Sequence, residues 1–103
     1  MTKVKWVPTA VRSLEETLQF QESQWTEAGI KKFLKSLTSI VSVIETFPEG
    51  FAKIGLDDMR RAVLAPSKHH CLIYEYRNEV VWIILIWDGR RNPENLPPLL
   101  KGR

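Results

Sequence analysis

The stretch CLIYEYRNEVVWIILIWDGRRNP, residues 71–93, decides the fold of this chain. Two runs of β-branched and aromatic residues flank the polar Arg77-Asn78-Glu79, and they predict two strands, over residues 69–76 and 80–87. With Asn78 and Glu79 as the central turn residues, the two strands form an antiparallel hairpin. The second strand ends in Asp-Gly-Arg-Arg-Asn-Pro, so the hairpin is followed directly by cations.

Opposed residues of an antiparallel hairpin share a face, which allows the two faces to be written out. One face is apolar, is expected to pack against helices, and pairs Tyr76 with Val81, Tyr74 with Ile83 and Leu72 with Leu85. The other face is mixed and pairs Arg77 with Val80, Glu75 with Trp82, Ile73 with Ile84, Cys71 with Ile86 and His69 with Asp88. A slip of one residue in register would exchange the faces.

Upstream of the hairpin, the pattern predicts a strand over residues 3–7, a helix over 9–25 and a second helix with Thr26 as its N-cap. The second helix carries one continuous apolar stripe at helical spacing, which is expected to be core: Ile30, Phe33, Leu34, Leu37, Ile40, Val41 and Ile44. Pro48 ends it. A loop over 47–58, a strand over 59–65 and a turn at 66–67 lead into the hairpin. The expected fold is α+β, in the order β-α-α-β-β-β, with a curved antiparallel sheet backed by a two-helix hairpin.

Two helices can cover only one face of such a sheet, so the mixed face is expected to be exposed. Ile73, Trp82, Ile84 and Ile86 would then form an apolar patch of the kind that marks an interaction surface. Two other coverings are possible: the tail over residues 93–103, which is expected to be mobile, or an identical subunit.

Length and composition fit one globular domain over residues 1–103, with 44% hydrophobic and 26% charged residues. No signal peptide is apparent, and the apolar run 80–87 is too short for a membrane helix. The single cysteine, Cys71, fits a reducing compartment, so a soluble cytoplasmic protein is expected.

The net charge of +3 belongs to the second half, where nine cations face six acids. Arginine predominates there, which suits either an anionic partner or simply a soluble surface.

The element order, the strand Leu-Ile-Tyr-Glu-Tyr, the apolar strand Val-Val-Trp-Ile-Ile-Leu-Ile-Trp and the closing Asp-Gly-Arg-Arg-Asn-Pro resemble the RelE/ParE toxin family. The opening Val-Lys-Trp-Val-Pro-Thr-Ala is similar to that family's first strand and helix, and the resemblance covers residues 3–95. It implies the toxin of a bacterial type II toxin–antitoxin system, of the plasmid-stabilisation kind, which inhibits growth and is silenced by a cognate antitoxin. A homodimer or a hetero-oligomer with the antitoxin would be compatible with it.

Members of the family divide by target: RelE-like toxins cut mRNA in the ribosome, and ParE-like toxins inhibit DNA gyrase. Gly89-Arg90-Arg91 is similar to the ParE-like ending, although Asp88 stands where a histidine is common. The resemblance therefore favours action on gyrase, with the following target-binding candidates: Arg77, Asp88, Arg90 and Arg91. The apolar patch of Ile73, Trp82, Ile84 and Ile86 is the candidate antitoxin surface.

A RelE-like ribonuclease remains an alternative. It needs a base, cations for the phosphate and an acid for the leaving oxygen. Six residues are candidates for catalysis, with Tyr74 or Tyr76 behind them: Lys53, Arg60, Arg61, His69, His70 and Arg77. Arginine keeps its proton at neutral pH, so only His69, His70 and Lys53 could carry one.

His69 opposite Asp88 would be an oriented imidazole. An inactive relic that only binds an antitoxin is a third possibility. The two histidines lack ligand spacing, so neither a metal nor a cofactor is expected.

Overall fold

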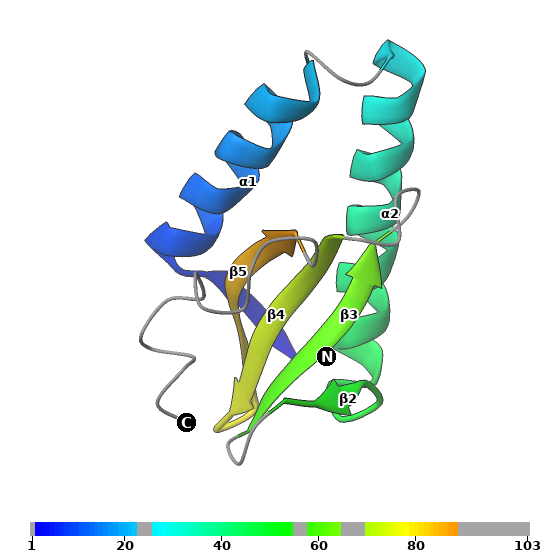
Figure 1. Ribbon diagram of the computed structural model, residues 1–103. Coiled ribbons are helices and arrows are strands. Elements are labelled where there is room, and N and C mark those ends of the chain that lie inside the picture. The colour runs from blue at the N-terminus through cyan, green and yellow to red at the C-terminus, as the bar shows by residue number, and fades with distance from the viewer. Residues whose placement is uncertain (1, 23–25, 55–57, 65–69, 89–103) are drawn as a thin grey trace.

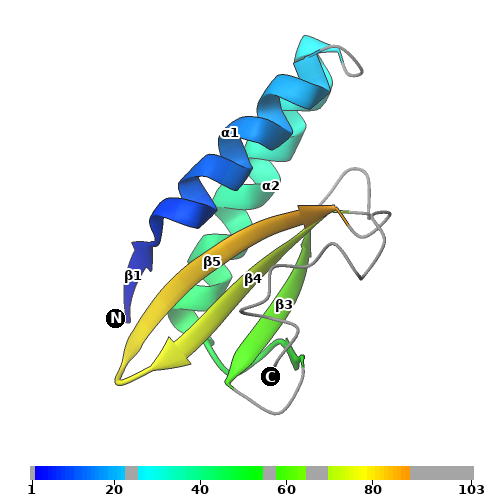
Figure 2. The ribbon, with the colours of Figure 1, turned by 60° about the vertical axis from the view of Figure 1, so that its left-hand side comes forward.

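The computed structural model describes residues 2–22, 26–54, 58–64 and 70–88. Its elements follow the chain as β1 (Lys3–Trp6), α1 (Pro8–Glu22), α2 (Glu27–Thr46), β2 (Ala52–Lys53), β3 (Met59–Leu64), β4 (His70–Arg77) and β5 (Val80–Asp88). The strands form one sheet in the order β1-β5-β4-β3-β2, and both helices lie on one side of it (Figures 1 and 2). The α+β class and the predicted order are confirmed, and β2 is an additional short strand within the expected loop.

Helix α2 begins and ends where the sequence predicts. The Thr26 hydroxyl accepts a hydrogen bond from the Gly29 amide at 3.1 Å, as an N-cap does, and Phe47 follows the last helical residue. The centre of its apolar stripe is buried, at Phe33, Leu37 and Ile44, whereas Leu34 on the flank is 38% exposed. Of the helices in the described ranges, neither is long and apolar enough to span a membrane.

The hairpin turn is also confirmed. Arg77 pairs with Val80, and Asn78 and Glu79 both have positive φ, at 53° and 64°. Two consecutive left-handed residues are the geometry of a type I′ turn, whose twist matches that of the strands. Asn tolerates this region well, whereas Glu carries a steric cost there.

The predicted pairing fails beyond the middle of the hairpin because of a β-bulge. Tyr74 pairs with Ile83, but Ile73 pairs with Leu85, so Ile84 is an extra residue on β5. From the Ile73–Leu85 pair to the end of β5, the pairing is shifted by one residue relative to the prediction. Ile86 therefore joins the helix-facing core and Leu85 the opposite face, the reverse of the prediction.

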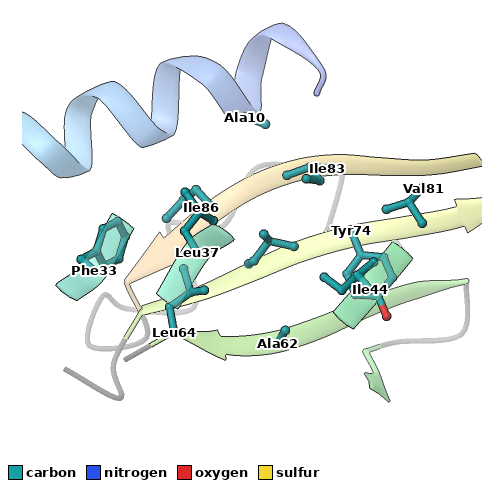
Figure 3. Close-up of a cluster of buried hydrophobic side chains, with 11 residues drawn as sticks. Ala10, Phe33, Leu37, Ile44, Ala62, Leu64, Tyr74, Val81, Ile83 and Ile86 are labelled. Atoms are coloured by element: carbon teal, nitrogen blue, oxygen red, sulfur yellow. The ribbon is translucent and has the colours of Figure 1, made fainter. Parts of the chain in front are cut away.

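The main core lies between the helices and the sheet (Figure 3), and we call it the helix-side core. Its buried members come from both helices and three strands: Ala10, Phe33, Leu37, Ile44, Ala62, Leu64, Leu72, Tyr74, Val81, Ile83 and Ile86.

Helix α1 is joined to β5 through one hydroxyl. Ser13 Oγ donates to the Ala10 carbonyl at 2.8 Å and accepts from the Ile86 amide at 2.9 Å. The Ser13 hydroxyl thus gives the Ile86 amide an acceptor in the part of β5 that lies beyond its pairing with β1.

Strand β1 runs parallel to β5, so the sheet is mixed rather than wholly antiparallel. The two helices separate β1 from the next strands, and this long connection lets the chain return for a parallel pairing.

Candidate functional site

Three of the cations singled out in the sequence come together beside the hairpin turn. Lys53 on β2 pairs with Arg60 on β3, and Arg77 ends β4. They border a hollow of about 350 Å³, which we call the cationic hollow, lined by Glu49, Lys53, Asp58, Arg60, Tyr76, Arg77 and Asn78. Glu49 and Asp58 carry no local sequence signal that would have singled them out, and the sequence marked Asn78 as a turn residue rather than as part of a site.

The two exposed cations of the hollow, Lys53 and Arg77, each form an ion pair with a neighbouring carboxylate. Lys53 Nζ lies 3.9 Å from Asp58 Oδ1, and Arg77 Nε lies 3.4 Å from Glu75 Oε1. Both side chains of the Lys53–Asp58 pair are more than half exposed, so this pair contributes little to stability, whereas Glu75 in the other pair is only 13% exposed.

Arg60 is engaged in the structure of the neighbouring loop. Its Nη1 donates to the carbonyl of Glu49 at 3.1 Å and to that of Phe51 at 2.8 Å. Its Nε is buried without a hydrogen-bond partner among the described residues. The guanidinium therefore ties the segment between α2 and β2 to the sheet.

Tyr74 holds the same loop from the adjacent strand. Its hydroxyl donates to the Pro48 carbonyl at 2.6 Å, and its ring lies edge-on to Phe51, with centroids 6.2 Å apart. Burial raises the pKa of the Tyr74 phenol to about 12, although the nearby Arg60 guanidinium acts in the opposite direction. The phenol is thus a neutral donor at physiological pH rather than a base.

The histidine of the described chain lies at the other end of β4. His70 is buried, at 2% exposure, its ring is edge-on to Phe33 with centroids 5.6 Å apart, and its backbone pairs with Asp88. Seven residues of strand place it roughly 23 Å from Arg77. The predicted partnership of His69 with Asp88 is wrong, because the bulge brings His70 to that position, and His69 itself lies outside the described residues.

Arg61 is separated from the cationic hollow as well. It pairs with Ile73, so it belongs to the sheet face opposite Arg60 and Tyr74. Of the six catalytic candidates, the structure gathers Lys53, Arg60 and Arg77 and keeps His70 and Arg61 apart from them. Among the described residues, no three His, Cys, Asp or Glu side chains are grouped as metal ligands.

The expected exposure of the apolar patch is wrong. Ile73 and Ile84 are 3% and 9% exposed, and Ile86 faces the helices at 4%. The face opposite the helices has a cluster of its own, which we call the second-face cluster: Met59, Cys71, Ile73, Ile84 and Leu85. Four partly buried side chains of the described residues pack against this cluster: Val7, Ile54, Trp82 and Trp87.

The target-binding candidates do not form one rim within the described chain. Arg77 adjoins the turn of the hairpin, whereas the backbone of Asp88 pairs with His70 at the far end. Arg90 and Arg91 lie outside the described residues.

Comparison with protein families decides the identity of this fold. The family model described as the ParE toxin of the type II toxin–antitoxin system parDE matches residues 4–93. The chain belongs to this family. A search among curated proteins returns no match. As a ParE-family toxin, the protein has an antitoxin as its partner, and the match spans both helices and all described strands apart from Lys3, the first residue of β1.

Proposed function

We propose that this ParE-family toxin inhibits growth by binding DNA gyrase, without cutting nucleic acid itself, and that its antitoxin relieves the inhibition. Such an action would serve plasmid stabilisation and would take place in the cytoplasm. The family match supports the toxin role, and the action on gyrase follows from the resemblance to ParE-like members.

One observation carries the choice of binding over cleavage. The Tyr74 phenol, close to the Arg60 that lines the cationic hollow, is committed to the Pro48 carbonyl, with its pKa raised to about 12. A ribonuclease needs a group that gives up and takes back a proton near neutral pH. Arginine does not do so, and His70 is buried at the opposite end of β4.

The cationic hollow supports a second candidate, an mRNA endonuclease of the RelE type. Lys53 and Arg77 are exposed and both line the hollow with Asn78, and cations at such a site can stabilise a phosphate. In that mechanism the proton carrier would be Lys53, with the Tyr76 phenol, which also lines the hollow, behind it.

A supercoiling assay tests the proposal. Purified toxin at micromolar concentration is expected to block the supercoiling of relaxed plasmid by gyrase, and added antitoxin should restore it. Undisturbed gyrase would refute the proposal.

Primer extension on mRNA after induction distinguishes the alternative. The proposal expects no codon-phased cuts, and it expects Lys53→Ala to retain toxicity. Codon-phased cuts that disappear in Lys53→Ala would establish the endonuclease instead, and harmless expression of the wild type would indicate an inactive relic.

A further inference from the structure

The loop between α2 and β2 is tied to the sheet through its own backbone (Figure 1). The side chains of Arg60 on β3 and Tyr74 on β4 donate hydrogen bonds to three carbonyls of this loop, those of Pro48, Glu49 and Phe51. We call residues 47–51 the braced loop. Surface loops usually move more than the elements that they connect, and these three bonds restrict such movement.

The braced loop is also closed against its first residue. The Phe47 amide donates to the Val43 carbonyl at 2.8 Å, and the Gly50 amide donates to the Phe47 carbonyl at 3.0 Å. A Cβ at position 50 would lie 3.2 Å from that carbonyl oxygen and 3.4 Å from the Phe47 Cβ, which is a tight fit. The backbone of Phe47 is therefore held from both sides, by the end of α2 and by the turn.

The side chain of Phe47, in contrast, is uncovered. At 64% exposure, Phe47 is the most exposed large apolar residue in the described part of the chain, and Val43, one turn earlier, is 44% exposed. Aromatic side chains are enriched at the centres of protein–protein interfaces, and a side chain on a fixed backbone loses less conformational entropy when it binds. The braced loop thus presents an apolar anchor suited to a protein partner.

The surroundings of this anchor are acidic. Glu45 and Glu49 stand two residues before and after Phe47, and α2 has no basic residue in its last turn to balance the negative end of its dipole. Glu79 of the hairpin turn lines the same hollow of about 680 Å³ as Glu45, at the same end of the molecule (Figures 1 and 2). Within the described ranges, none of these three carboxylates forms an ion pair.

The cations at this end do not balance the three carboxylates. Lys53 and Arg77 are paired with acids of their own. Arg60, which donates to loop carbonyls, and Lys3, which lines the larger hollow, are the other cations of the two hollows. Two cations therefore face three free carboxylates, so the surface around Phe47 is acidic on a toxin whose net charge is +3.

The sign of this local charge selects the partner. The cationic toxin as a whole suits an acidic partner, whereas the acidic surface around Phe47 suits a basic one. A second copy of the chain docked at the same surface would set carboxylates against carboxylates, which is unfavourable. An enzyme that binds DNA presents basic residues to the phosphates, so the target of the toxin has the complementary charge.

We propose that Phe47, with the acidic side chains beside it, is the contact surface for gyrase. Phe47 enters an apolar pocket of the enzyme, and Glu45 and Glu49 lie against basic residues at the rim of that pocket. This inference rests on the proposed function and assigns the recognition of the target to the end of α2 and the braced loop.

Phe47→Ala in the supercoiling assay tests the anchor. The toxin concentration that gives half-maximal inhibition should rise about tenfold, because the buried phenyl group is lost from the interface. Phe47→Leu keeps an apolar side chain and should cause a smaller rise. Val63→Ala is the matched control: Val63 is 53% exposed on β3, and its substitution should leave inhibition unchanged. Thermal melts confirm that each variant is folded.

Glu45→Lys together with Glu49→Lys tests the charge argument. Inhibition should weaken, and its sensitivity to added salt should decrease, relative to the control Glu15→Lys with Glu16→Lys on the exposed side of α1. Lysine near the end of α2 complements the helix dipole, so a loss of inhibition in this variant would not come from a weakened helix.

Binding measurements separate gyrase from the other two partners. The antitoxin encoded by the short reading frame adjoining the toxin gene, titrated by calorimetry, should bind Phe47→Ala as tightly as it binds the wild type. Sedimentation should give the same mass for both toxins. Weaker antitoxin binding, or dissociation of a toxin dimer, with inhibition of gyrase unchanged would assign the surface to that partner instead.

Full inhibition of gyrase by Phe47→Ala would overturn the inference and leave the proposed function intact. A wild-type toxin that does not inhibit gyrase at all would remove the proposed function, and the inference with it.

Discussion

The two faces of the sheet are both buried, but they are built differently. The helix-side core combines side chains of both helices with buried polar groups that have fixed partners, such as Ser13 with Ile86 and Tyr74 with Pro48. Among the described residues, the buried members of the second-face cluster all come from strands, and the side chains that pack against them come from strands and the residues beside them. Buried polar contacts are satisfied in only one arrangement, so the helix side fixes where the loops and helices lie, whereas an apolar cluster can repack.

Alanine substitutions at two adjacent positions of β5 compare the two faces directly. They should give the largest losses of stability among these predictions. Ile83 belongs to the helix-side core and is fully buried, and Ile84 belongs to the second-face cluster. We expect Ile83→Ala to lower the free energy of unfolding by about 3–5 kcal/mol, and Ile84→Ala by about 2–3 kcal/mol, because the second-face cluster can close around a small cavity. Urea denaturation measures both; equal losses would show that the two faces are packed alike.

Tyr74 should make the helix-side core sensitive to high pH. Its pKa is about 12 in the folded chain against 10.0 for the free side chain, so above pH 10 the unfolded state ionises first. The free energy of unfolding should be fully retained below pH 10 and fall by on the order of 2 kcal/mol as the pH approaches 12.

Tyr74→Phe should remove this pH dependence and cost about 1–2 kcal/mol at neutral pH, because the partly buried Pro48 carbonyl loses its donor. Tyr76→Phe, on the same strand, is the control and should leave the dependence intact. A wild-type stability that stays flat from pH 10 to pH 12 would contradict the assignment.

The hairpin turn between β4 and β5 belongs to neither face of the sheet. A substitution there should give the smallest change in the free energy of unfolding. Glu79 has a φ of 64°, where a Cβ is strained, so Glu79→Gly should raise the free energy of unfolding by about 0.5–1 kcal/mol. Glu79→Ala keeps the Cβ and should give no such gain. Thermal melts of the two variants measure this difference in stability. An equal stabilisation by Glu79→Ala would show that removal of the charge is responsible.

The sequence allowed the prediction of those parts that depend on local pattern. The apolar stripe of α2, its Thr26 cap and the hairpin turn at Asn78-Glu79 all follow from side-chain spacing and backbone preference. The family match also agrees with the resemblance carried by the strand sequences.

The remaining features depend on contacts that no local pattern encodes. The bulge at Ile84 has no sequence mark within a continuous apolar run, and it moved Ile86 to the helix side and replaced His69 with His70 opposite Asp88. The role of Arg60 was missed for a similar reason: its partners are backbone carbonyls, which every residue has. In the candidate site, the grouping of Lys53 with Arg77 depends on β2, a strand of two residues.

The position of β5 between β1 and β4 has a consequence for synthesis of the toxin. The first strand of the chain finds its partner only in the last described one, so a nascent chain that has not yet reached residue 88 lacks the complete strand that joins β1 to the rest of the sheet. The Ser13 contact with Ile86 spans 73 residues and is equally late. Residues up to 88 must therefore have left the ribosome before β1 and α1 can be fixed to the rest of the sheet, so the fold is completed late in synthesis.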